Sequence, residues 1–208
     1  MNRTVFTLPA EDIAVSHEVD VLVAGGGPAG VAAAISAARS GAQTLLIEQR
    51  GFLGGMGTVA LVPAFCPYSD GEKAVVRGIG LELLERMKAE CEPEFRERFG
   101  AELDWVPIDP EVLKRVYDEA VAESGAEVLL HTIASQTVMD GDGGRIDGVV
   151  IVNKSGRSLI RARTVIDTTG DADLAALAGA PFHKGGEAGE LQAATMCYLL
   201  ANVDRRRF

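Results

Sequence analysis

The stretch from Val19 to Glu48 constrains the fold of this chain most strongly. An apolar run is followed by a glycine-rich turn, an alanine-rich segment and a second apolar run that ends in an acidic residue. The glycines have the spacing Gly25-x-Gly27-x-x-Gly30. This order of strand, glycine turn, helix, strand and acid is the full context of a dinucleotide-binding unit, whereas the glycine spacing alone is weak. We therefore predict strands at Val19–Ala24 and Gln43–Glu48, joined by a helix from Pro28 to Ser40.

The residues of the turn have separate predicted roles. Gly25 permits the tight turn, Gly27 lets a pyrophosphate approach the backbone, and Gly30 allows the helix to pack closely on the sheet. Pro28 and Ala29 begin the helix, whose free N–H groups and positive dipole end attract phosphate.

An acidic residue at the end of the second strand predicts which dinucleotide is bound. Glu48 is expected to accept hydrogen bonds from a ribose 2′-hydroxyl, and its charge disfavours the 2′-phosphate of NADP. Arg50 has two open roles: contact with the adenine or a phosphate, or a solvated surface position.

Composition excludes several classes of protein. A length of 208 residues suits one domain, or one domain with an appendage. The net charge of −10 argues against a nucleic-acid surface. No run of 18 apolar residues is present, so no transmembrane helix is expected, and residues 1–14 lack the apolar core of a secretory signal. Scattered cysteines and histidines predict no metal site and a cytoplasmic protein with reduced thiols: Cys66, Cys91, Cys197, His17, His131 and His183.

The middle of the chain is predicted to be helical. Residues 59–106 form an insertion with one helix over Gly80–Phe99, since apolar residues recur there at helical spacing. Asp109 is a predicted cap for a further helix that begins at Pro110 and ends before Gly125.

Strands dominate the remainder. A buried strand is expected at Glu127–His131, and the alternating pattern after it predicts a three-stranded antiparallel meander. Its strands are Ser135–Met139, Ile146–Val152 and Ser158–Ala162. Further elements are a buried strand at Thr164–Thr169, a short helix at Leu174–Leu177, an apolar run of strand character at Ala193–Leu200, and a possible edge strand at Val5–Leu8.

With these motifs in place, the chain resembles the FAD-dependent oxidoreductases with a glutathione reductase-type FAD domain, and within them the succinate dehydrogenase/fumarate reductase-like flavoproteins. Four features match in order: the Gly25–Gly30 fingerprint with Glu48, the Gly54–Thr58 loop, the helix, strand and meander from Asp109 to Ala162, and the segment Val165–Asp171. The resemblance implies an α/β fold, a Rossmann-like FAD-binding domain with a parallel central sheet and the β-meander.

The resemblance also implies a set of cofactor-binding residues. They are Gly25, Gly27, Pro28, Ala29, Gly30, Glu48, Gln49, Arg50, Gly54, Gly55, Met56, Gly57, Thr58, Ile133, Ala134, Thr169, Gly170 and Asp171. Because the Gly54–Thr58 loop has no histidine, FAD is expected to be non-covalent, and because only Cys66 follows that loop, a dithiol mechanism is not expected.

Three side chains carry alternative roles. Asp167 is expected to cap a nearby loop in preference to acting in catalysis. Asp171 is a candidate cofactor contact, with an N-cap of the Leu174–Leu177 helix, by Asp171 or Asp173, as the alternative. Cys66 is expected to be a packed, inert thiol, with a position facing the substrate as the alternative.

The predicted domain organisation is a lead-in at residues 1–18, the FAD-binding domain at 19–180, and the start of a truncated substrate domain at 181–208. The predicted function is the FAD-binding portion of an oxidoreductase that passes hydride between a small organic substrate and FAD. The catalytic residues are not identifiable. The chain is expected to associate with further copies of itself in a homo-oligomer or with a missing C-terminal half. The alternatives are a non-catalytic or split-subunit nucleotide-binding module and, more weakly, an NAD-binding protein.

Overall fold

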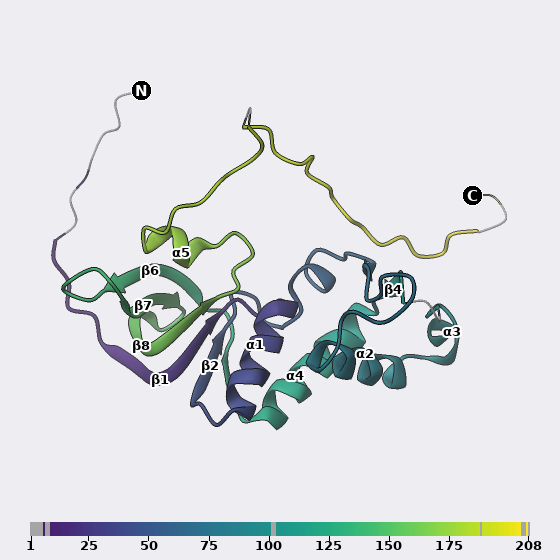
Figure 1. Cartoon of the computed structure of the whole chain (residues 1–208), viewed down its shortest axis with the longest axis horizontal. Coiled ribbons are helices and arrows are strands. Elements are labelled where there is room, and N and C mark those ends of the chain that lie inside the picture. The colour runs from purple at the N-terminus through teal and green to yellow at the C-terminus, as the bar shows by residue number, and fades with distance from the viewer. Residues whose placement is uncertain (1–5, 7–8, 101–102, 188, 205–206, 208) are drawn as a thin grey trace.

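The computed structural model describes residues 6, 9–100, 103–187, 189–204 and 207. Its elements alternate between strands and helices over most of the chain (Figure 1). In chain order they are β1 Val15–Ala24, α1 Pro28–Arg39, β2 Thr44–Ile47, the 3-10 turn η1 Gly55–Gly57, β3 Ala64–Phe65, α2 Ile79–Glu90, α3 Pro93–Arg96, β4 Val106–Pro107, α4 Pro110–Ser124, β5 Glu127–Leu129, β6 Ile133–Met139, β7 Ile146–Asn153, β8 Gly156–Asp167 and α5 Asp173–Leu177.

One six-stranded sheet has the order β5-β2-β1-β8-β7-β6. Its first four strands are parallel, and β8, β7 and β6 form an antiparallel meander. The predicted fold class is therefore confirmed, including the meander. A second sheet of two short strands, β3 and β4, lies within the insertion.

The sheet buries a core on each face, because successive strand residues point to opposite sides. Val23 and Leu46 face the helices and pack with residues of α1, α2 and α4. Leu22 and Leu45 face the other way and pack with residues of β7, β8 and α5. Figure 1 shows α1, α2 and α4 gathered on one side of the sheet, with α5 beside β6.

The predicted helix over Gly80–Phe99 is wrong in its extent. Helix α2 ends at Glu90, Cys91 has an extended backbone, and the separate helix α3 begins at Pro93. Proline has no backbone N–H to donate to a helical hydrogen bond, and it disfavours helical geometry in the residue before it. The helix capped by Asp109 is confirmed, since the Asp109 carboxylate accepts hydrogen bonds from the backbone N–H groups of Glu111 and Val112.

Two predicted strands differ from the structure. Ser158–Ala162 and the first four residues of Thr164–Thr169 belong to one strand, β8, which ends at Asp167 and is antiparallel to β7 and parallel to β1. No glycine or proline separates them, so nothing interrupts the extended backbone. The strand predicted as buried at Glu127–His131 is the short edge strand β5, with Glu127 and Val128 exposed. His131 lies beyond it with φ of 52°.

The ends of the chain also differ from expectation. Strand β1 begins at Val15, inside the predicted lead-in. The possible strand at Val5–Leu8 lies outside the described residues except for Phe6. The apolar run Ala193–Leu200 forms no strand; most of its residues are exposed, and its backbone lies outside the sheets and helices (Figure 1). A strand needs a neighbour for its backbone hydrogen bonds, and the run has none among the described residues.

Candidate functional site

A cavity of about 550 Å³ lies at the carboxyl ends of the parallel strands β1, β2 and β8. This edge of a doubly wound sheet is where such folds bind ligands. Most of the predicted cofactor-binding residues line it. They are Gly25, Gly27, Pro28, Ala29, Glu48, Gln49, Arg50, Gly55, Met56, Ile133, Ala134, Thr169, Gly170 and Asp171.

Four predicted residues do not line the cavity and instead support its walls: Gly30, Gly54, Gly57 and Thr58. A Cβ on Gly30 would overlap the carbonyl oxygen of Gly25, so the absence of a side chain at Gly30 allows α1 to pack closely against the glycine turn. Gly57 packs against Leu113 and Ile108. Thr58 is buried and donates a hydrogen bond to the carbonyl of Leu53 at 3.0 Å. Their effect on a ligand is therefore indirect.

Gly27 lies at the open floor of the cavity. Its backbone is extended, and, beyond its two chain neighbours, the described residues offer a Cβ there one contact within 4 Å, the Cα of Gly55 at 3.9 Å. Helix α1 begins at the next residue with no side-chain cap and no acidic residue in its first turn. An uncapped helix N-terminus beside an open backbone surface suits an anion.

Glu48 is buried and has a role that the sequence does not reveal. One carboxylate oxygen accepts a hydrogen bond from the backbone N–H of Gly26 at 2.7 Å, and the other accepts one from the N–H of Arg50 at 2.7 Å. Because each carboxylate oxygen has two lone pairs, both retain capacity for a ligand hydroxyl. Glu48 therefore joins the glycine turn to the loop after β2.

The neighbouring wall is formed where the chain passes from β5 to β6. The N–H of Thr132 donates to the carbonyl of Glu48 at 2.9 Å, and the N–H of His131 donates to the carbonyl of Arg50 at 3.0 Å. These bonds place Ile133, which is half exposed, at the cavity. The Arg50 side chain has no ion-pair partner in the described part of the chain, so both of its predicted roles stay open.

The third wall is the turn from Thr168 to Asp173. The Thr168 hydroxyl donates to the carbonyl of Gly25 at 2.8 Å, which ties this turn to the glycine turn. Asp167 accepts hydrogen bonds from the N–H and hydroxyl of Thr169 and from the N–H of Ala175. The prediction that Asp167 caps a loop is confirmed. Partial burial alone would raise its pKa, but these hydrogen bonds outweigh that and the pKa is lowered.

The alternative role given to Asp171 and Asp173 is wrong. The N-cap position of α5 is Ala172, which has no side-chain cap, and the carboxylate that accepts from the first turn belongs to Asp167. Asp171 and Asp173 instead line the cavity.

Comparison with known proteins identifies the family. The model of the family described as FAD dependent oxidoreductase matches residues 20–208. The chain belongs to this family. FAD is accordingly the cofactor, and the chain contains a flavoprotein's FAD-binding domain.

Curated relatives are longer than this chain. A digeranylgeranylglycerophospholipid reductase from Methanoculleus marisnigri is 28% identical over 187 residues, which cover 79% of this chain and 42% of the relative. A thiamine thiazole synthase from Pyrobaculum calidifontis is 28% identical over 190 residues, which cover 86% of this chain and 66% of the relative.

Solved structures share the fold. THI4 from Thermovibrio ammonificans matches with a TM-score of 0.57 and 21% identity, over 77% of this chain and 61% of that one. A geranylgeranyl bacteriochlorophyll reductase-like protein from Thermoplasma acidophilum matches with a TM-score of 0.55 and 23% identity, over 78% and 42%.

Sequence reasoning missed several residues that line the cavity of this flavoprotein: Ala24, Ile47, Val59, Ala60, Thr132, Thr168 and Asp173. Ala24 and Ile47 end β1 and β2, so their position at the carboxyl edge was a usable signal. Val59 and Ala60 follow the glycine loop without any motif, and no sequence signal identifies them.

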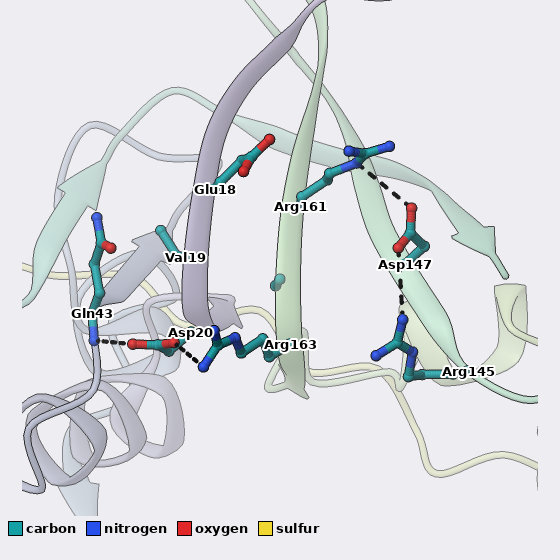
Figure 2. Close-up of a pocket in the computed structure, with 9 residues that line it drawn as sticks. Glu18, Val19, Asp20, Gln43, Arg145, Asp147, Arg161 and Arg163 are labelled. Atoms are coloured by element: carbon teal, nitrogen blue, oxygen red, sulfur yellow. Dashed lines mark hydrogen bonds and ion pairs between the residues drawn. The ribbon is translucent and has the colours of Figure 1, made fainter.

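A second cavity, of about 290 Å³, has a different character (Figure 2). Its charged side chains come from β1, β8, β7 and the residue just before β7, and they largely neutralise one another. Arg163 pairs with Asp20 at 3.2 Å, and Asp147 lies 3.6 Å from Arg161 and 3.9 Å from Arg145. None of the predicted site residues lines it.

The cysteines and histidines supply no metal site in the described part of the chain, where no cluster of three potential ligands occurs. The expectation that Cys66 is packed is wrong, since it is exposed. Cys91 is the buried thiol, and burial raises its pKa. Among the described helices, none has the length and apolar character needed to cross a membrane.

Proposed function

We propose that the 550 Å³ cavity holds FAD non-covalently, and that the intact protein passes hydride between a small organic substrate and this cofactor. The observation that most supports this proposal is the open backbone at Gly27. Its missing Cβ leaves space at the N-terminus of an uncapped helix, where Gly55 is the one described residue nearby apart from the chain neighbours of Gly27. A polypeptide gains nothing in packing from such a gap, whereas a pyrophosphate needs it.

The pyrophosphate, the ribose and the adenine of FAD each have suitable residues in the cavity. Gly27, Ala29 and Gly55 offer backbone to the pyrophosphate, because they surround the start of α1. Glu48 is held by two backbone N–H groups in an orientation that leaves lone pairs for a ribose diol. Ile133 and Ala134 offer an apolar surface to the adenine.

FAD supplies the hydride chemistry when bound, and the protein supplies binding and orientation. In this chain the described residues of the cavity bind the nucleotide, and Met56 and Val59 form the rim of the cavity. We assign no acid or base. We propose residues 19–180 as the FAD-binding domain and residues 181–208 as the beginning of a substrate domain. The free cysteines support a cytoplasmic location.

The alternative is a module that binds the nucleotide and acquires its substrate site from another polypeptide or another copy. Its support is the apolar rim of the cavity, where Met56 is 64% exposed, together with the exposed apolar side chains of Met196 and Leu199. Apolar surface of this kind is typical of a face that a partner covers.

Reconstitution tests the proposal. We expect the purified chain to bind FAD in titration calorimetry and NAD much more weakly, and to show flavin absorption after gel filtration. A colourless protein that cannot be reconstituted would contradict it. Flavin that is bound but is reduced by no organic substrate until a second polypeptide is added would favour the module.

A further inference from the structure

Asp167, the last residue of β8, is the centre of a hydrogen-bond network behind the cavity. One carboxylate oxygen accepts from the N–H of Thr169 at 3.0 Å and from its hydroxyl at 2.7 Å. The other oxygen accepts from the N–H of Ala175 at 2.9 Å. The Thr169 hydroxyl oxygen in turn accepts from the N–H of Asp173 at 2.9 Å. The network thus joins the strand, the turn and α5.

The turn that this network holds has an unfavourable backbone. Gly170 has φ of 94° and Ala172 has φ of 57°. The left-handed region costs nothing for glycine but is disfavoured for alanine, whose Cβ approaches the backbone. A non-glycine residue keeps this conformation only where surrounding contacts enforce it.

Asp167 itself does not line the cavity, whereas Thr169, Gly170, Asp171 and Asp173 do. The Asp167 carboxylate has no ion-pair partner among the residues that the structure describes; all its partners are N–H and O–H donors of the turn and helix. It therefore acts on the cavity through the segment that it holds.

We propose that Asp167 is a positioning residue of the cofactor site, whose carboxylate clamps the Thr168–Asp173 turn in the conformation that faces FAD. This inference rests on the proposed function, because it assumes that the cavity is the FAD site. The clamp requires both oxygens of the side chain to accept hydrogen bonds, as only a carboxylate can. This explains a carboxylate at a strand end where it has no ion-pair partner among the described residues.

Two substitutions test the clamp. Asp167→Asn replaces one acceptor oxygen by an NH₂ group that faces donors, and Thr169→Val removes the bridging hydroxyl while keeping its shape. For each we expect the Kd for FAD to rise about tenfold or more, which is the equivalent of one lost hydrogen bond to a charged group. Hydrogen exchange of the Asp173 and Ala175 amides should accelerate by a similar factor.

A rescue separates positioning from general destabilisation. Ala172→Gly removes the conformational cost of the turn, so adding it to Asp167→Asn should recover part of the lost FAD affinity. Asp20→Asn is the matched control. Asp20 also accepts a backbone N–H, from Gln43 at 3.0 Å, but it lies at the second cavity (Figure 2). We expect Asp20→Asn to leave the Kd for FAD unchanged.

The outcomes are distinct. If Asp167→Asn bound FAD with the wild-type Kd, the positioning role would be overturned. Unchanged exchange at Asp173 and Ala175 would overturn the clamp itself, whatever the wild-type protein binds. If instead the wild type bound no FAD while the exchange of these amides responded as expected, the proposed function would fail and with it the cofactor role of Asp167.

Discussion

Glu48 and Gly26 are joined by a hydrogen bond of 2.7 Å from the backbone N–H of Gly26 to the Glu48 carboxylate. This bond connects the end of β2 to the glycine turn after β1. The same carboxylate accepts from the N–H of Arg50. Glu48 is thus part of the frame of the nucleotide cavity as well as a candidate ribose ligand, and the two roles make different predictions.

We expect Glu48→Ala to weaken FAD binding by about 1.5–3 kcal/mol, because it removes a charged acceptor of ribose hydroxyls. It should also lower the free energy of unfolding by about 2 kcal/mol, since the N–H groups of Gly26 and Arg50 lose their partner. Calorimetric titration and urea denaturation measure the two effects. If the variant lost the expected unfolding free energy but kept the wild-type Kd for FAD, Glu48 would not be a ribose ligand and would have only its structural role in the cavity frame.

Gly27→Val should abolish FAD binding while the protein stays folded. The extended backbone of Gly27 suits any residue, and, apart from its chain neighbours, its Cβ would meet among the described residues the Cα of Gly55 at 3.9 Å and nothing closer. The side chain would occupy the space proposed for the pyrophosphate. The cost in unfolding free energy should be about 1 kcal/mol, as for a poorer helix N-cap.

The matched control for Gly27→Val is Gly30→Ala, only three residues further along the chain. Its Cβ would overlap the carbonyl oxygen of Gly25 and come within 2.8 Å of the Thr168 hydroxyl, so this variant should lose its fold. Flavin stoichiometry after gel filtration and circular dichroism distinguish the two. Retention of FAD by Gly27→Val at wild-type stoichiometry would refute the proposed position of the pyrophosphate.

The contribution of Asp167 to stability should depend on pH in one direction. Its hydrogen bonds lower its pKa below the ordinary value of 3.8. A carboxyl group with a lowered pKa stabilises the folded state above its unfolded pKa, and that stabilisation is lost as the pH falls through the folded pKa. The difference in unfolding free energy between wild type and Asp167→Asn should therefore be independent of pH near neutrality. It should shrink as the pH falls below 3.8. Denaturation curves across this range test it; divergence on acidification would contradict the cause given for the shift.

Sequence reasoning predicted the parts of the fold that local chemistry determines. The glycine turn, the helix after Asp109 and the meander each carry their own signal. The break at Cys91 is not visible in the apolar spacing, which continues through Pro93, and the proline is its main local signal. The union of two predicted strands in β8 was missed because a strand that serves both a meander and a parallel sheet has no local signature. Most of the cavity was predicted, since motif residues gather at strand ends. The frame role of Glu48 was not, because a hydrogen bond across 22 residues depends on tertiary structure.

The apolar run Ala193–Leu200 should promote association of the isolated chain. Met196, Tyr198 and Leu199 are between 75% and 88% exposed, and adjacent exposed apolar side chains favour contact with another surface. We expect the apparent mass in light scattering to rise with protein concentration. Replacement of these three residues by serine should abolish the rise without changing the Kd for FAD. A wild-type mass independent of concentration would contradict this prediction.

The flavin ring should be accessible to solvent in FAD bound to this chain. The nucleotide part has walls on three sides, formed by Gly25–Ala29, by Glu48 with Ile133, and by the Thr168–Asp173 turn. At the rim, Met56 is 64% exposed and Val59 is 39% exposed. The described residues therefore give the flavin ring little cover there. Bound FAD should therefore fluoresce strongly and be quenched by iodide almost as efficiently as free FAD. Its affinity should come mainly from the adenosine side, so ADP should compete with it effectively. A bound flavin that is protected from iodide, and that ADP displaces poorly, would place the closed end of the site within this chain.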